Sequence, residues 1–296
     1  MSNVIAGYLV MGLAAALFWV SYRVRQAPTF RLVLLNRWLR WGLFGVGMAY
    51  LVRDWGGSYR PYWALAPTFL LIWMLVESVY TWLAVRALSL SSLPVFPSYR
   101  GGVPEVNWPV EPRFLKVKEE IRSLGFTVRE KMRAELGEYM TLTSVIYADE
   151  ENKTRLQVIF VPRPNSRPAL FFIFTSKSES ERWGTENVWL PFGGVVPRSW
   201  HIDRKPFCTS PAKLLQRHRR KIEKAGEELV SFDDQWVDEL NEEQDTLDRV
   251  STEEGILFSR RHRPEYGKLT GDGRYRVWKQ ILLLNFFGCV GRRDLG

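Results

Sequence analysis

The chain has few residues that could build a disulfide framework or a metal centre. It contains only two cysteines, Cys208 and Cys289, and three histidines in 296 residues. The cysteines are too far apart for such a framework, and no closely spaced pair is present for zinc. The histidines are too scattered to supply a metal site, so the sequence predicts neither a metal nor another cofactor. Phosphate-loop, dinucleotide-binding, zinc-protease and serine-hydrolase motifs are also missing.

Lysine is absent from the first 100 residues, which also contain only two acidic residues, Asp54 and Glu77. Nine arginines give this part a net charge of +7, whereas residues 101–296 carry a net charge of +2. The basic character of the protein therefore belongs to a stretch in which arginines flank apolar runs, as they do in membrane proteins. This origin of the charge favours membrane lipids over nucleic acid as partners.

Three apolar stretches within residues 1–88 predict three transmembrane helices, at about 4–20, 33–52 and 63–85. Five arginines between residues 23 and 40 follow the first stretch, so we expect that loop in the cytoplasm and the N-terminus outside. No basic segment precedes the first stretch, which favours an uncleaved anchor over a signal peptide. With three spans of a cell membrane, the large C-terminal part is expected on the cytoplasmic side.

The second stretch is free of charge only over residues 41–52, about 18 Å of helix against a hydrocarbon core of about 30 Å. Either it forms a re-entrant hairpin, or the helix begins earlier and takes Arg37 and Arg40 into the membrane edge. In antiparallel helices Glu77 lies at a depth similar to that of Arg40, so we expect an intramembrane ion pair of Glu77 with Arg40 or Arg37. Otherwise, Glu77 lies at a subunit interface, or is neutral and bonded to nearby hydroxyl groups.

The rest of the chain predicts a linker and a soluble α+β domain, so that the whole reads as a membrane-anchored α+β protein. Residues 89–112 contain five prolines and predict an extended linker, and the domain covers residues 113–296. Apolar runs rich in β-branched residues predict an antiparallel sheet, with strands at 139–148, 156–162 and 169–175 and weaker ones at 126–133 and 187–191. Helices are predicted at 113–124, 211–225, 231–252 and 275–287.

One of these helices carries a concentration of basic side chains: Lys213, Arg217, Arg219, Arg220, Lys221 and Lys224. Residues 233–254 hold ten acidic residues and one arginine, so we expect the two helices to pack antiparallel with complementary charges. The alternatives are contact with anionic lipid headgroups or with an acidic partner protein. His218, which lies among the arginines, is expected on the helix surface.

His201, Asp203 and Cys208 form the one compact set of residues with catalytic side-chain types. Two residues apart on a strand, His201 and Asp203 point to the same side and could orient an imidazole toward the thiol, as in Cys–His catalysis. A surface strand end followed by a buried cysteine is the more common arrangement, because no family-like sequence surrounds Cys208.

These features favour a non-enzymatic, membrane-anchored accessory or scaffold protein, whose cytoplasmic domain contacts a protein partner, a second copy of the chain or the lipid surface. Two alternatives remain from other classes. One is a membrane-bound enzyme with a site near His201, Asp203 and Cys208, and the other is a transport component that uses Glu77.

Overall fold

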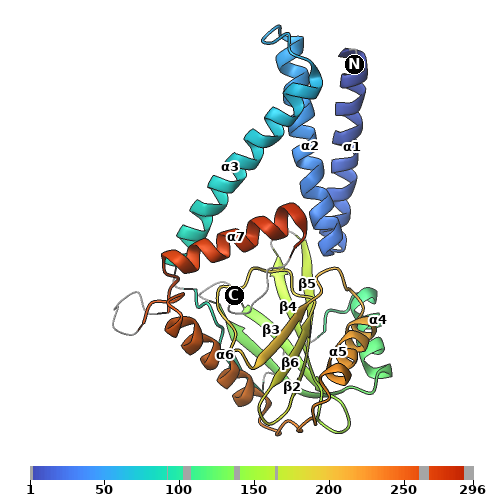
Figure 1. Ribbon diagram of the computed structural model, residues 1–296. Coiled ribbons are helices and arrows are strands. Elements are labelled where there is room, and N and C mark those ends of the chain that lie inside the picture. The colour runs from blue at the N-terminus through green and yellow to red at the C-terminus, as the bar shows by residue number, and fades with distance from the viewer. Residues whose placement is uncertain are drawn as a thin grey trace.

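A computed structural model describes residues 3–91, 93–102, 108–136, 141–163, 166–259 and 267–289. Three long helices, α1 (Asn3–Gln26), α2 (Phe30–Asp54) and α3 (Tyr62–Leu90), form a bundle at one end of the molecule (Figure 1). The other end is a domain with a seven-stranded sheet and, among the described residues, four further helices. The predicted combination of an N-terminal helical region and an α+β domain is confirmed.

Two of the bundle helices are long and apolar enough to cross a membrane, over Val4–Gln26 and Tyr62–Leu90. In each, only 11% of the most apolar stretch is buried inside the protein. A core helix of a soluble protein would be mostly buried, whereas here large apolar side chains such as Phe18 and Leu75 face outward. This exposure is what a helix surrounded by lipid presents.

The middle helix, α2, departs from the prediction of three spans. It carries Arg31, Arg37 and Arg40 in its first half and does not reach the apolar composition of the other two helices. By length and composition the described chain therefore has two candidate spans rather than three. Even so, α2 lies between α1 and α3, and Gly45 is buried so close to α3 that a Cβ there would lie 3.0 Å from the Ala66 carbonyl oxygen.

The seven strands follow one another in the sheet in the order in which they occur in the chain. They are β1 (Tyr99–Arg100), β2 (Thr127–Glu135), β3 (Thr141–Ala148), β4 (Arg155–Arg163), β5 (Ser166–Lys177), β6 (Arg182–Glu186) and β7 (Trp200–Arg204). All neighbouring strands pair antiparallel except β6 and β7, which are parallel. Of the predicted run 139–148, residues 139 and 140 lie outside the described residues.

The strand predicted at 187–191 is wrong, and β1 and β6 were not predicted, whereas β7 is the strand on which His201 and Asp203 were expected. β6 ends before Asn187, whose side chain makes hydrogen bonds where a neighbouring strand would otherwise pair. Its Oδ1 accepts a hydrogen bond from the Phe172 amide at 2.7 Å, and its Nδ2 donates one to the Cys208 carbonyl at 3.0 Å. The chain then crosses irregularly to β7, as a parallel neighbour requires.

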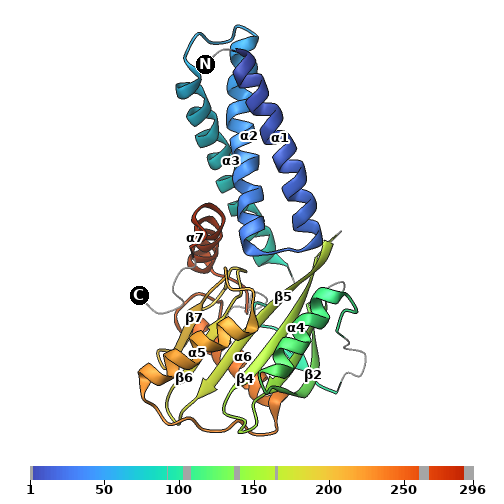
Figure 2. The same ribbon diagram turned by 90° about the vertical axis from the view of Figure 1, so that its right-hand side faces the viewer.

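Helices cover both faces of the sheet (Figures 1 and 2). α4 (Pro112–Ser123) and α5 (Pro211–Ala225) pack on one face, and α6 (Trp236–Glu253) packs on the other. The side chains of β3 alternate between the two cores: Val145 and Tyr147 contact the α4–α5 side, and Ile146 and Ala148 contact the α6 side. The central strands are therefore buried on both faces.

The last helix, α7 (Gly271–Phe287), lies between the bundle and the sheet (Figure 1). The Trp278 indole donates a hydrogen bond to the Ser78 carbonyl of α3 at 3.0 Å. At the other end of α7, Phe286 stacks on Trp41 of α2 with ring centroids 4.0 Å apart. The predicted apolar helix 275–287 thus packs against two of the bundle helices, α2 and α3.

The segment predicted as an extended linker, 89–112, lies against the domain where it is described. The backbone of Tyr99 exchanges hydrogen bonds of 2.8 and 2.9 Å with the Asn241 side chain of α6. Trp108 is buried beside Phe160, at a ring-centroid distance of 5.1 Å. Aromatic side chains therefore hold this segment on the domain, and the bundle packs against the domain rather than standing at the end of a spacer.

The start of α7 offers a direct test of this packing. Replacing Gly273 by alanine would drive a Cβ into the Ile256 carbonyl oxygen, whereas a Cβ at Gly271 meets nothing within 4 Å. We expect Gly273→Ala to lower the free energy of unfolding by about 1–3 kcal/mol, as overpacking does, and Gly271→Ala to leave it nearly unchanged. Thermal unfolding in detergent measures both, and equal stability of the two variants would contradict the position of α7.

Candidate functional site

The exposed side of α5 carries a concentration of positive charge. Ser210 caps the helix, its hydroxyl accepting a hydrogen bond from the Lys213 amide, and Gly226 ends it in the left-handed conformation at φ 70°. Leu214 and Leu215 fill the core below. The exposed basic side chains, called here the α5 basic face, are Lys213, Arg217, Arg219, Arg220 and Lys224. The sixth, Lys221, is half-buried and donates to the His201 carbonyl at 2.6 Å.

The predicted pairing of this helix with the acidic helix is wrong. α6 lies across the sheet from α5 (Figure 1), because each helix has its own apolar stripe and each stripe covers a different face. The carboxylates of α6 that are buried belong to other partners, described below. Within the described part of the chain, no carboxylate lies within ion-pair distance of the α5 basic face.

α5 also points away from the bundle (Figure 2). It begins soon after Phe207, whose ring lies 4.8 Å from that of Phe30 at the start of α2. Its last turns reach Asp149 and Lys153 in the turn between β3 and β4, with which they line a surface hollow. That turn is separated from the bundle end of β4 by about 26 Å of strand. Most of the α5 basic face is therefore held away from the end of the domain that meets the bundle.

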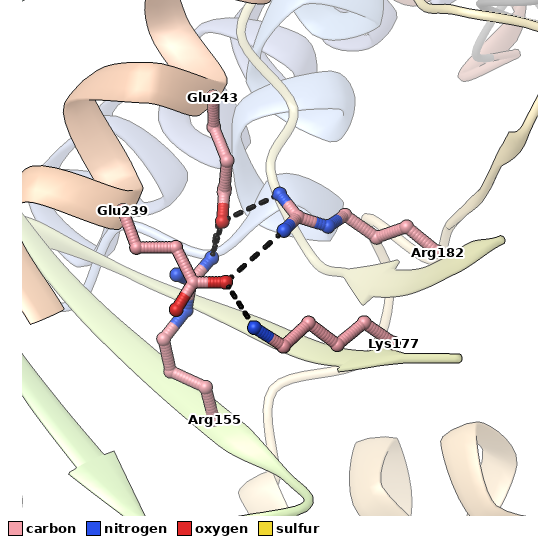
Figure 3. Close-up of polar contacts among 5 residues, drawn as sticks. All are labelled: Arg155, Lys177, Arg182, Glu239 and Glu243. Atoms are coloured by element: carbon pink, nitrogen blue, oxygen red, sulfur yellow. Dashed lines mark hydrogen bonds and ion pairs between the residues drawn. The ribbon is translucent and has the colours of Figure 1, made fainter. Parts of the chain in front are cut away.

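A second group of charges is buried between the sheet and α6 (Figure 3). The Glu243 carboxylate lies 2.7 Å from the Arg155 guanidinium of β4 and 2.6 Å from the Arg182 guanidinium of β6. Glu239, one turn earlier, contacts Lys177 at 2.9 Å and Arg182 at 3.3 Å. Because Arg155 is 2% exposed, this group ties α6 to three strands through desolvated charges.

This group was not predicted, although the pattern contained a partial signal. Arg155 lies two residues before Gln157 and therefore on the same strand face, opposite to Leu156. Glu239 and Glu243 are four residues apart, beside the apolar Trp236 and Leu240 stripe. Charged residues are seldom fully buried, so the sequence favoured the surface for all of them.

The candidate catalytic set is not assembled. The His201 imidazole lies 3.2 Å from the Glu181 carboxylate, and Asp203 pairs with Lys205 at 2.9 Å. Cys208 is buried among apolar core residues and donates its thiol hydrogen bond to the Ser210 carbonyl. Each side chain has a separate partner, and this arrangement provides no relay from a base to the thiol.

The charged residues of the bundle do come together. The Glu77 carboxylate of α3 contacts the Arg37 guanidinium of α2 at 3.3 Å through one oxygen, and the other oxygen accepts a hydrogen bond from the Trp41 indole. Arg40, the other expected partner, is exposed. Both oxygens of Glu77 thus have donors supplied by α2.

Among the described residues, no group of three or more histidine, cysteine or acidic side chains is arranged to hold a metal ion. Comparison with protein-family models, with curated proteins and with solved structures finds no match to this chain. Its function must therefore be argued from its own residues.

The prediction that His218 is a surface residue is wrong. Its ring is fully buried on the inner side of α5, where Nε2 lies 3.1 Å from the Ser176 hydroxyl and Nδ1 lies 3.0 Å from the Thr185 hydroxyl. Burial, together with the charges of Lys221 and Arg219, lowers the pKa of His218 to about 3. The ring is therefore neutral at pH 7 and bridges two strands.

The lowered pKa of His218 predicts a loss of stability in acid. Between pH 6.5 and about 3 the unfolded histidine binds a proton that the folded one does not, so stability falls as the pH decreases, by about 1.4 kcal/mol per pH unit. His218→Gln removes this contribution. Its stability deficit relative to the wild type should shrink at that slope from pH 6 to pH 4.5, measured by chemical unfolding. A deficit independent of pH would contradict a neutral buried ring.

The buried charges predict a second effect on stability. Glu243→Gln keeps the size of the side chain but leaves the Arg155 and Arg182 charges without this carboxylate, which should lower the free energy of unfolding by about 3 kcal/mol. Glu242→Gln, the same change on the exposed side of α6, is the control and should cost less than about 0.5 kcal/mol. Similar losses in the two variants, measured by denaturant unfolding, would show that the buried pairs contribute nothing.

Proposed function

We propose that the protein is a non-enzymatic, membrane-anchored scaffold that holds an acidic partner protein on the α5 basic face. The observation that carries the proposal is the exposure of this face. Five cationic side chains lie on one element, and the acidic helix that could have covered them packs on the far side of the sheet. Such a surface attracts and orients an acidic partner and gives little affinity for neutral ones.

The anchor is a three-span bundle with the N-terminus outside and the domain in the cytoplasm. α1 and α3 have the composition of spans, and α2 lies between them with Gly45 buried against α3. An arginine within α2 is tolerable because Glu77 neutralises Arg37, and the pair lies toward the domain end of the bundle. The five arginines from 23 to 40 also lie toward that end, as the positive-inside rule requires of the cytoplasmic side.

A protein partner fits the α5 basic face better than the membrane surface does. The helix points away from the bundle, so its later residues, including Lys224, lie too far from the headgroups for an interaction screened over about 8 Å. An enzyme at His201 and Cys208 gains no support from their separate partners. A transport role for Glu77 gains none either, since both of its oxygens are engaged by α2.

The test combines charge reversal with a charge-conserving control. The full-length protein is isolated from native membranes in mild detergent, and a copurifying protein is identified and its affinity measured. Arg217, Arg220 and Lys224 lie on one side of α5. Changing all three to glutamate should weaken binding at least tenfold, with a matching loss of salt dependence. Arg217→Lys with Arg220→Lys keeps the charge and should bind as the wild type does.

Two outcomes would contradict the proposal. One is a partner whose affinity is unchanged by charge reversal, and the other is a partner that binds without an acidic surface. The unfolding temperature of the glutamate variant is measured alongside, because exposed residues of α5 should tolerate the change within a few degrees. For the topology, labelling of residues 53–60 from the cytoplasmic side would contradict three spans.

A further inference from the structure

A cavity of about 210 Å³ lies where the bundle, α7 and the domain meet. Its apolar walls include Val33 and Leu34 of α2 and Leu284 of α7. Two arginines also line it, Arg37 of α2 and Arg163 at the end of β4. The cavity is therefore an apolar space with two cationic groups, formed by elements from three parts of the chain.

The two guanidinium groups are incompletely satisfied. Arg37 uses its Nε on Glu77, but its Nη1 is buried and has no hydrogen-bond partner. Arg163 also has a buried Nη1 without a partner, and no carboxylate among the described residues lies within ion-pair distance of it. Its one aromatic contact is with Trp189, 5.4 Å from the ring centroid. Burying donors of a charged group without acceptors is costly, and burial also lowers the pKa of Arg163.

The charges at the cavity favour an anion. Glu77 neutralises Arg37 but leaves Arg163 uncompensated, so the lining carries a net positive charge. Planar guanidinium groups bind the oxygens of a phosphate in pairs, and two of them from different elements can hold one phosphate. Two arginines that line one cavity, one of them without a carboxylate partner among the described residues, fit such a group.

The position of the cavity favours a lipid as the source of the phosphate. Phe30, the first residue of α2, contributes to the lining. Arg37 lies about 10 Å further along α2, in the direction away from the domain. This is the boundary between the helices that have span composition and the polar domain, the level at which phospholipid headgroups lie. The apolar walls on α2 and α7 would contact the adjoining acyl chain, which a free phosphate ion lacks.

We propose that Arg37 and Arg163 bind the phosphate of an anionic phospholipid in this cavity. The inference rests on the membrane location in the proposed function, but not on the α5 basic face. A lipid bound there would bridge α2 of the bundle and β4 of the domain. It would also contact α7, so that lipid binding would fix the angle between domain and membrane.

The test uses the full-length protein in delipidated detergent, to which phosphatidylglycerol, phosphatidylcholine or inorganic phosphate is added. Phosphatidylglycerol should raise the unfolding temperature of the wild type and be retained near one molecule per chain by native mass spectrometry. Arg163→Gln should lose at least tenfold in affinity for this lipid, while Arg163→Lys should lose less. Arg40→Gln removes the same charge from exposed α2 and is the matched control, expected to change the affinity by less than about twofold.

The unfolding temperature separates a binding role from a structural one. Without lipid, Arg163→Gln should be at least as stable as the wild type, because the variant removes a half-buried charge that no carboxylate of the described residues neutralises. With phosphatidylglycerol the order should reverse. A variant that is less stable under both conditions, or that binds the lipid as the wild type does, would overturn the site.

The remaining outcomes test the source of the phosphate and the membrane location on which this inference rests. Equal stabilisation by inorganic phosphate, lost in Arg163→Gln, would overturn the lipid as ligand. Equal binding of phosphatidylcholine would overturn the preference for an anionic lipid. A protein that stays soluble without detergent would overturn the membrane location itself, whereas loss of lipid binding in a protein that needs detergent would overturn only this site.

Discussion

Glu77 contacts Arg37 and Trp41 from the neighbouring helix, and the junction of bundle and domain is organised around this contact. A carboxylate among apolar helices is stable only if its oxygens are engaged, and α2 supplies both donors. The indole held in this way stacks on Phe286 and so sets the position of the end of α7. α7 in turn packs on α3 through Trp278 and on the domain through the amide of Gln280. This polar contact thus connects the bundle, through α7, to the domain.

The two faces of the sheet meet their helices by different physical means. The α4–α5 face is closed by aromatic and aliphatic side chains, with His218 as a neutral polar bridge. The α6 face has a smaller apolar cluster and is completed by Arg155, Arg182 and the two glutamates. Because α6 uses its buried carboxylates on the strands, they are not available to the bases of α5. The exposure of the α5 basic face is therefore a consequence of how the opposite face is held together.

Periodicity predicted much of the fold, because it reports burial directly. The runs at 156–162 and 169–175 became β4 and β5, and the helix at 211–225 was predicted with both of its ends, since Ser210 and Gly226 act locally. β6 was not predicted because a short strand such as Arg182–Glu186 is half polar and its burial depends on distant neighbours. The depth argument based on helical rise matched Glu77 with Arg40, whereas the structure pairs it with Arg37, the other expected partner, three residues away.

The pairing of charged residues was harder to predict than the helices and strands, as α5 and α6 illustrate. A count of opposite charges on neighbouring segments says nothing about which side of the sheet each segment covers. Only the apolar stripes decide that, and those of α5 and α6 select different faces. In the same way, Arg163 ends an ordinary strand, and nothing in its neighbours along the chain indicates that it lines a cavity together with α2. Long-range contacts of this kind come from the topology.

The uncompensated positive charge is found in two environments that select different partners. At the cavity the guanidinium groups are partly desolvated and bordered by apolar walls, so an anion must bring an apolar neighbour to be preferred over hydrated ions. On α5 the bases are in water and spread along the helix, where only several carboxylates acting together gain more than screening removes. A lipid phosphate suits the first environment and an extended acidic protein surface suits the second. The two proposals therefore follow from the solvation of the charges. They predict that added salt weakens binding only slightly at the cavity and strongly on α5.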